Sequence, residues 1–220
     1  MKRQHKSDRP VSGDMTATRP LSELSDAELL AQLLAGPAAQ TRSQAILREF
    51  GGLGGLARQT TQDLARFPGL GAVSSRRLPV ALELARRCAR EALEVTDVLS
   101  SPQAVRDFLH YHLGFRDREV FSCLYLDSQH RLLRYDDLFF GTLDGAAVYP
   151  REVAIRALQY RAGALIFAHN HPSGVAQPSA ADRRITERLS SALALFDIRV
   201  LDHLIVGRGT TYSFAENGIL

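Results

Sequence analysis

The stretch that decides the fold, Ala168–Asp182, reads AHNHPSGVAQPSAAD. The apolar run at residues 164–167 comes directly before it and is typical of a short buried strand. Because the side chains of a strand alternate between its two faces, His169 and His171 are expected to point in the same direction. The sequence therefore predicts two imidazole groups at the end of a buried strand.

An acidic side chain follows the two histidines at a distance that a turn can close. The segment Pro-Ser-Gly at residues 172–174 predicts this turn, and a helix is expected from Ser179 with Asp182 in its first turn. Two imidazoles and one carboxylate aimed at a common point would suit zinc, with the fourth position left open for water.

A structural interpretation of the same residues must be weighed. Ser179 and Asp182 also form a Ser-x-x-acid capping box, in which both side chains satisfy helix amides. His169 alone would be interpreted as a partly buried strand histidine. Capping does not explain why two histidines on one face stand near an acid, so the spacing favours a metal site, although Asp182 could cap or ligate.

The pattern resembles a known signature. His169-x-His171, seven residues, Ser179, two residues and Asp182 match the motif of the JAB/MPN-type metalloproteases, known as the JAMM motif. The longer phrase HNHPSG, with VYPRE before it and VLDHLIVG after it, resembles the RadC family of bacterial proteins in particular. The resemblance runs from about residue 24 to residue 214 and is strongest over residues 119–207.

The resemblance implies a catalytic set. His169, His171 and Asp182 would hold zinc, Glu119 would be the general base, and Ser179 would donate a hydrogen bond to the developing oxyanion. Spacing alone does not nominate Glu119, which without the family would be interpreted as a solvated acid. His203 could orient a ligand, but a satisfied strand histidine is the favoured interpretation.

Bulk properties describe an ordinary globular chain. The 220 residues are 45% hydrophobic and 23% charged, which predicts one or two domains with a sizeable core. No apolar run approaches the roughly 20 residues of a membrane helix, and no secretory signal follows the N-terminus. Two cysteines, Cys88 and Cys123, predict reduced thiols in a cytoplasmic protein rather than a disulfide framework.

The basic balance lies in the first half. Residues 1–92 carry 14 Lys or Arg against 9 Asp or Glu, a balance of +5, whereas residues 93–220 carry 13 against 15, a balance of −2. The first half is thus compatible with a weak preference for polyanions, although the excess is modest.

The order of patterns predicts four segments. We expect a disordered tail at residues 1–20, a helical domain at 21–94, a linker at 95–101 and a second domain at 102–220, which the resemblance implies is a JAB/MPN metallohydrolase domain. In the last segment, strands and amphipathic helices predict a mixed sheet flanked by helices, of the α+β or α/β type. The resemblance implies the cytidine-deaminase-like sandwich of the JAB/MPN fold.

The helical domain contains a motif that resembles a helix-hairpin-helix element. Gly69 and Gly71 let the backbone approach a ligand closely, and the amides at the next helix start can hold a phosphate of DNA. Arg76 and Arg77 follow, so contact with DNA would not read its sequence. A plain turn between helices is the alternative interpretation; the hairpin is preferred for the fold, whereas DNA binding and a packing unit remain equally open for its function. Pro79 departs from the pattern and predicts that the second helix breaks near residue 78.

A second His-x-His pattern is interpreted differently. His110 and His112 fall in a helix expected from Pro102, where positions two apart do not face each other. We therefore interpret them as surface or packing histidines.

Two classes of function remain. The first is a zinc-dependent hydrolase, most consistent with a peptidase or isopeptidase, joined to a helical hairpin domain. The second is a DNA-binding accessory protein of repair or recombination, with a structural metal or with hydrolysis of a non-peptide bond. Glu119 discriminates between them, because a purely structural site needs no base beside an open position.

Overall fold

The computed structural model describes residues 19–94, 97–141 and 148–220. Residues 1–18 of the predicted tail, and residues 95–96 of the predicted linker, lie outside the described residues. Within the described part, no helix is both long and apolar enough to cross a membrane.

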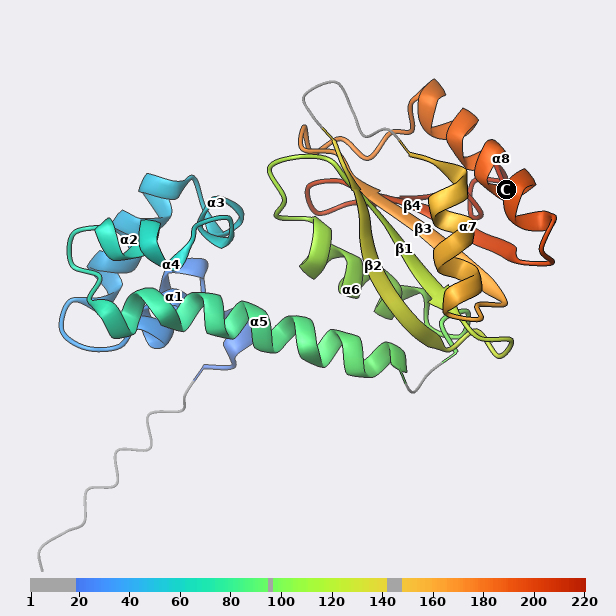
Figure 1. The fold of residues 1–220 in the computed structure, drawn as a ribbon. Coiled ribbons are helices and arrows are strands. Elements are labelled where there is room, and N and C mark those ends of the chain that lie inside the picture. The colour runs from blue at the N-terminus through green and yellow to red at the C-terminus, as the bar shows by residue number, and fades with distance from the viewer. Residues whose placement is uncertain (1–18, 95–96, 142–147) are drawn as a thin grey trace, which may run out of the picture.

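Helices make up the N-terminal part (Figure 1). After a short 3-10 turn, η1 (Leu21–Glu23), the chain forms α1 (Asp26–Leu34), α2 (Ala39–Phe50), α3 (Leu53–Ala57), α4 (Thr61–Arg66) and α5 (Ala72–Glu94). Capping boxes at Ser25 and Thr60 start α1 and α4. These helices enclose a small core of buried side chains: Leu30, Leu34, Ile46, Leu56, Leu64 and Leu70.

The predicted break at Pro79 is wrong. Helix α5 is continuous over 23 residues with Pro79 inside it. An interior proline removes one helical hydrogen bond and costs about 3 kcal/mol. Leu78 packs against the N-terminal core, and Leu93 on the same helix is fully buried in a core shared with the sheet. Packing at both ends of α5 outweighs the local preference of the proline.

Helix α5 links the two parts of the molecule. Its second half packs against α6 (Pro102–Leu113), where Arg86 Nε donates to the Tyr111 carbonyl at 2.8 Å. Figure 1 shows α5 as one long rod that runs from the N-terminal helices to the sheet. The helix therefore contributes to both cores.

The second part is built on a mixed five-stranded sheet, as the sequence predicts. Its strands are β1 (Val120–Leu126), β2 (Leu132–Phe140), β3 (Ala164–Asn170), β4 (Arg199–Val206) and β5 (Thr211–Ser213). They lie in the order β2-β1-β3-β4-β5; β3 and β4 are parallel, and the other neighbours are antiparallel.

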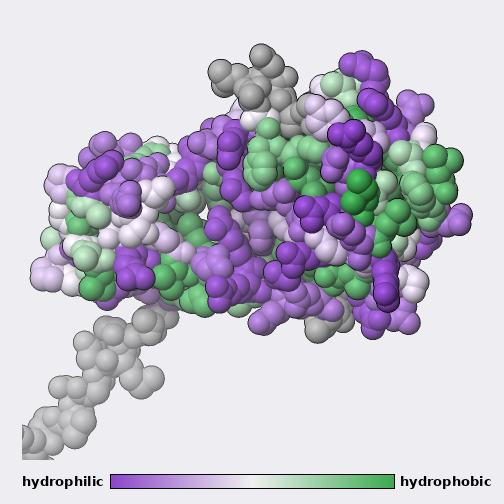
Figure 2. All heavy atoms as spheres, viewed as in Figure 1, coloured by the Kyte–Doolittle hydropathy of each residue, from purple (hydrophilic) through white to green (hydrophobic). Residues whose placement is uncertain are grey.

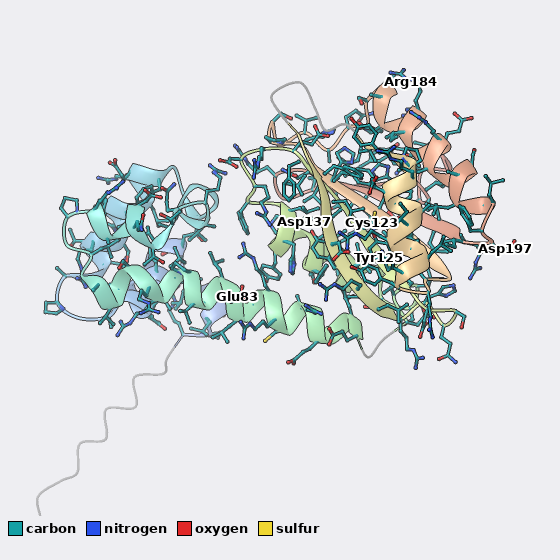
Figure 3. The ribbon with its side chains drawn as sticks, viewed as in Figure 1. Glu83, Cys123, Tyr125, Asp137, Arg184 and Asp197 are labelled. Carbon is teal, nitrogen blue, oxygen red and sulfur yellow. The ribbon has the colours of Figure 1, made fainter. Side chains whose placement is uncertain are left out.

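Helices cover both faces of the sheet. On one face, α6 packs Phe108 and Leu109 against β1 and β3. On the other, α7 (Pro150–Gln159) and α8 (Ala180–Ala194) bury side chains against Cys123 and Tyr125 of β1 (Figure 3). The fold is thus a helix–sheet–helix sandwich.

Three segments distant in sequence meet at one end of the strands in this sandwich. Because β1 and β3 are antiparallel, with Phe121 opposite His169, the start of β1 lies beside the end of β3. Helix α8 begins at this same end of the sandwich, near Arg184 in Figure 3, while Asp197 lies just beyond the other end of the helix. The candidate site lies where these segments meet.

Candidate metal centre

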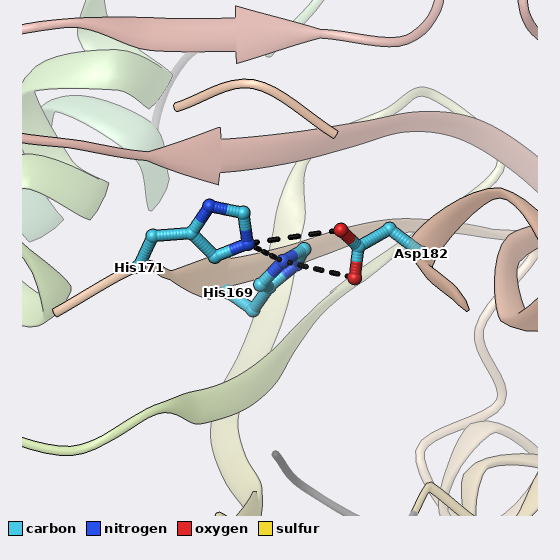
Figure 4. Close-up of side chains that lie close together, drawn as sticks. All are labelled: His169, His171 and Asp182. Atoms are coloured by element: carbon cyan, nitrogen blue, oxygen red, sulfur yellow. Dashed lines mark hydrogen bonds and ion pairs between the residues drawn. The ribbon is translucent and has the colours of Figure 1, made fainter. Parts of the chain in front are cut away.

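His169, His171 and Asp182 converge, as their spacing predicts (Figure 4). One ligand atom from each lies within 4.8 Å of the others. Nε2 of His169 is 3.0 Å from Nε2 of His171 and 3.4 Å from Oδ1 of Asp182, and Nε2 of His171 is 3.7 Å from Oδ2. His169 is 1% exposed, whereas the His171 side chain is 19% exposed, so the centre reaches from the core to the surface.

Asp182 both caps a helix and faces the histidines. Its Oδ2 accepts from the amide and the hydroxyl of Ser179, each at 2.7 Å, and its own amide donates to the Ser179 hydroxyl at 3.1 Å. The other oxygen, Oδ1, is the one directed at His169. Oδ1 takes no part in the capping box, so the two interpretations of Asp182 are compatible.

The loop after β3 determines which nitrogen of His171 carries the proton. Nδ1 of His171 lies 2.7 Å from the Val175 carbonyl oxygen. Since a carbonyl only accepts, Nδ1 must hold the proton, and neutral His171 presents the lone pair of Nε2 to the centre. The loop is packed so closely that a Cβ on Gly207 would lie 2.6 Å from the Gly174 carbonyl oxygen.

A buried chain of hydrogen bonds determines which nitrogen of His169 carries the proton. Thr186 Oγ1 donates to the Asp182 carbonyl oxygen at 2.6 Å, so its one proton is committed. It can then only accept from Nδ1 of His203, 2.5 Å away. Nε2 of His203 is left to accept from Nδ1 of His169, at 2.8 Å. His169 therefore also presents the lone pair of Nε2 to the centre.

The electrostatics favour a cation between the three groups. Burial lowers the pKa of His169 to about 4 and that of His203 well below its usual range, so both are neutral at pH 7. Burial raises the pKa of Asp182, but hydrogen bonds with His171 and Ser179 outweigh it, so the pKa is low and the group is charged. Contact with Asp182 raises the pKa of His171.

Two lone pairs and a carboxylate in such close contact repel one another unless a positive charge lies among them. The raised pKa of His171 agrees with this, because a proton on that imidazole would put a positive charge among the three groups. Two imidazole nitrogens and a carboxylate oxygen are also the ligand types of zinc, so the donor set fits this ion.

Glu119 lies beside the centre, although its position in sequence gave no sign of this. The pairing of β1 with β3 ends at Phe121 and His169, so Glu119 and His171 each lie two residues beyond the last pair. The negative charge of Glu119 is near enough to contribute to the raised pKa of His171. Among the described residues, Glu119 is not part of the set whose ligand atoms converge.

His203 and Thr186 were not among the predicted site residues. His203 is a satisfied, fully buried strand histidine, which is the interpretation that the sequence favoured, but one of its two partners is His169. A signal for Thr186 existed in the sequence: it lies four residues after Asp182, on the same face of the helix.

The histidines of α6 have local partners. Nδ1 of His112 lies 2.9 Å from the Phe108 carbonyl oxygen, and the ring of His110 meets that of Phe115 edge-on. Neither belongs to the converging set found among the described residues.

The two arginines that follow the glycine turn of the N-terminal part have different surroundings. Gly69 has a φ of 86°, which favours glycine, and its carbonyl accepts from Arg42. Nη1 of Arg77 donates to the carbonyls of Leu33 and Leu34, at 3.1 and 2.6 Å. Arg77 thus caps the end of α1, whereas Arg76 is exposed and available to a ligand.

Comparison with known proteins points to one family. The model of the RadC-like JAB domain matches residues 99–219. A UPF0758 protein of Methylibium petroleiphilum and one of Cellvibrio japonicus are each 52% identical over 201 residues, which is 90% of both chains. A UPF0758 protein of Idiomarina loihiensis is 49% identical over 207 residues, 92% of both chains. None of these names states an activity.

Proposed function

Since the chain belongs to the family of RadC-like JAB domain proteins, we propose that it is a zinc-dependent hydrolase of the peptidase or isopeptidase type. The observation that carries this proposal is the convergence of His169, His171 and Asp182, with both histidines in the tautomer that a metal ion requires. In this proposal the three side chains hold one zinc ion per chain. When bound, zinc supplies a water molecule of lowered pKa and polarises the carbonyl of the substrate.

Glu119 is the general base of the proposed reaction. Its carboxylate accepts the proton of the attacking water and can then deliver it to the leaving nitrogen of an amide. Support comes from its place beside His171, where its charge affects the pKa of that imidazole. A metal of purely structural function would need no such group, which favours catalysis over the structural alternative.

Ser179 would donate a hydrogen bond to the oxyanion in this proposal, which requires its hydroxyl to move. Its hydroxyl has one proton, and this proton is donated to Oδ2 of Asp182. To donate to an oxyanion instead, the hydroxyl must rotate away from the carboxylate. The amide of Ser179 also donates to Oδ2, so Asp182 would stay held during that rotation. We therefore assign the oxyanion contact to Ser179 in the transition state alone.

We further propose the domain organisation that the sequence suggests. Residues 21–94 would form a helix-hairpin-helix domain, 95–101 a linker and 102–220 the metallohydrolase domain. The exposed Arg76, next to the turn at Gly69 and Gly71, favours weak contact with DNA phosphates. This contact also supports the second candidate, a DNA-binding accessory function in repair or recombination.

A substrate screen tests the proposal. The zinc-loaded and the metal-free chain are incubated with peptide, isopeptide and DNA substrates, and the Glu119→Gln variant is the control for contaminating enzymes. We expect cleavage of an amide bond by the zinc-loaded wild type only. Cleavage of DNA would support hydrolysis of a non-peptide bond, and equal activity without zinc would contradict the hydrolase proposal.

A further inference from the structure

Asn170 stands between the two converging histidines but serves the other face of the strand. It is the last residue of β3 and is 2% exposed. Because alternate side chains leave a strand on opposite faces, its amide group points away from His169 and His171. The partners of this amide group belong to the segment that leads into β1.

The side chain of Asn170 binds the residues on both sides of Glu119. Its Oδ1 accepts from the Val120 amide at 2.9 Å. Its Nδ2 donates to the Arg118 carbonyl at 3.1 Å, with a longer contact of 3.5 Å to the Arg116 carbonyl. The Glu119 carbonyl in turn accepts from the Gly141 amide at 2.8 Å. The backbone around Glu119 is thus held from β3 on one side and from the end of β2 on the other.

This arrangement replaces a regular ladder. The pairing of β1 with β3 ends at Phe121 and His169, and beyond it the Asn170 side chain takes the place of a backbone partner. In a continued antiparallel ladder, Glu119 and His171 would face each other with Cβ atoms about 5 Å apart. A glutamate so near could reach an ion at the centre and occupy the position that water needs.

We propose that Asn170 is a positioning residue that holds Glu119 beside the metal centre and outside its coordination sphere. This inference rests on the proposed function. It assigns Asn170 a role distinct from that of its neighbours in sequence: the histidines bind the ion, and the asparagine between them determines that the nearby glutamate acts as a base.

The test uses cobalt(II) as the probe, because its visible spectrum changes with the number and type of ligands. The full-length chain is compared as wild type, Asn170→Ala, Glu119→Gln and the double variant. Wild type and Glu119→Gln should give the same spectrum, since Glu119 is not a ligand. Asn170→Ala should bind one equivalent with an altered spectrum, and the alteration should vanish in the double variant.

Turnover provides the second readout. On the substrate found by the screen, Asn170→Ala should lower kcat about 10²-fold with little change in KM, because misplacing a catalytic group by about 1 Å costs that much. Asn217→Ala is the matched control: this asparagine also donates to a carbonyl, that of Ser213 at 2.7 Å, but away from the site. It should leave spectrum and kcat unchanged.

Asn170→Asp covers the case in which the alanine variant does not fold. It is nearly isosteric and keeps the acceptor for Val120 but loses the donor to Arg118, so it should change spectrum and kcat in the same direction. If Asn170→Ala or Asn170→Asp binds cobalt with the wild-type spectrum and turns over normally, the positioning role is refuted. If wild type itself binds no cobalt, the proposed function fails, and this inference with it.

Discussion

Nε2 of His203 lies 2.8 Å from Nδ1 of His169, and the hydrogen bonds behind it determine which of the two carries the proton. The relationship joins two strands, since His169 is on β3 and His203 on the parallel strand β4. His203, which lies outside the converging set found among the described residues, therefore determines the tautomer of His169.

Replacing His203 should weaken zinc binding without removing a ligand. We expect His203→Ala to lower zinc affinity about 10- to 100-fold, because a residue that orients a ligand histidine typically contributes that much. Competition with a chelator of known affinity measures it. His112→Ala is the control, as His112 is a partly buried histidine whose Nδ1 lies within hydrogen-bond distance of a carbonyl. Equal affinity in His203→Ala and wild type would contradict the proposed orientation.

Asp182 can be separated from its capping role by a matched pair of variants. Asp182→Ala and Asp63→Ala each remove the acid of a capping box, which costs about 1 kcal/mol in the free energy of unfolding. Only Asp182→Ala should also lose zinc, measured as metal content by mass spectrometry. Stoichiometric zinc in both variants would show that Asp182 is a cap alone.

Glu119→Gln should separate metal binding from catalysis. The amide keeps the size of the side chain but cannot accept a proton from water, so we expect zinc to stay and the rate to fall by about 10²- to 10⁴-fold. His169→Ala should lose metal and activity together. Zinc content and turnover are measured side by side. Wild-type turnover in Glu119→Gln would remove its role as base, and loss of zinc from the folded variant would make it a ligand.

The metal-free chain should lose stability as the pH falls from 6.5, the ordinary histidine value, to about 4. In this window the unfolded chain binds protons at His169 and His203, whereas the folded chain does not. The free energy of unfolding therefore falls with falling pH, by at most about 1.4 kcal/mol per pH unit for each histidine.

His171 acts in the opposite sense, because its folded pKa is raised. Its contribution is fully present below the unfolded value of 6.5 and is lost as the pH rises through the folded value. Urea unfolding of the metal-free chain at several pH values measures the sum. His203→Gln should give a shallower slope between pH 6.5 and 4, and an unchanged slope would show that His203 is not buried in its neutral form.

We expect DNA binding to depend on Arg76 more than on Arg77. The full-length chain is the right sample, since a fragment that ends near residue 95 would expose the buried Leu93. Titration with duplex DNA at several salt concentrations should show affinity that falls with salt. Arg76→Ala should reduce the salt slope by about one, whereas Arg188→Ala, at an exposed position on α8, should not. No binding at low salt would leave the motif as a packing element.

The convergence of two histidines and one aspartate was predictable because it is local. His169, His171 and Asp182 lie within 14 residues, and strand alternation, a glycine turn and a capped helix suffice to bring them together. The mixed sheet and its flanking helices followed from periodicity for the same reason. The family resemblance added Glu119, which no local rule could nominate.

Other features were decided by tertiary structure. Glu119 lies beside the centre only because β1 pairs with β3, about fifty residues later in the chain, and His203 contacts His169 only because β4 lies beside β3. The continuity of α5 through Pro79 depends on the packing of this one helix into two separate hydrophobic cores. Sequence determines local conformation and the order of elements, but strand pairing and burial determine which distant groups share a low-dielectric site, and with that their tautomers and pKa values.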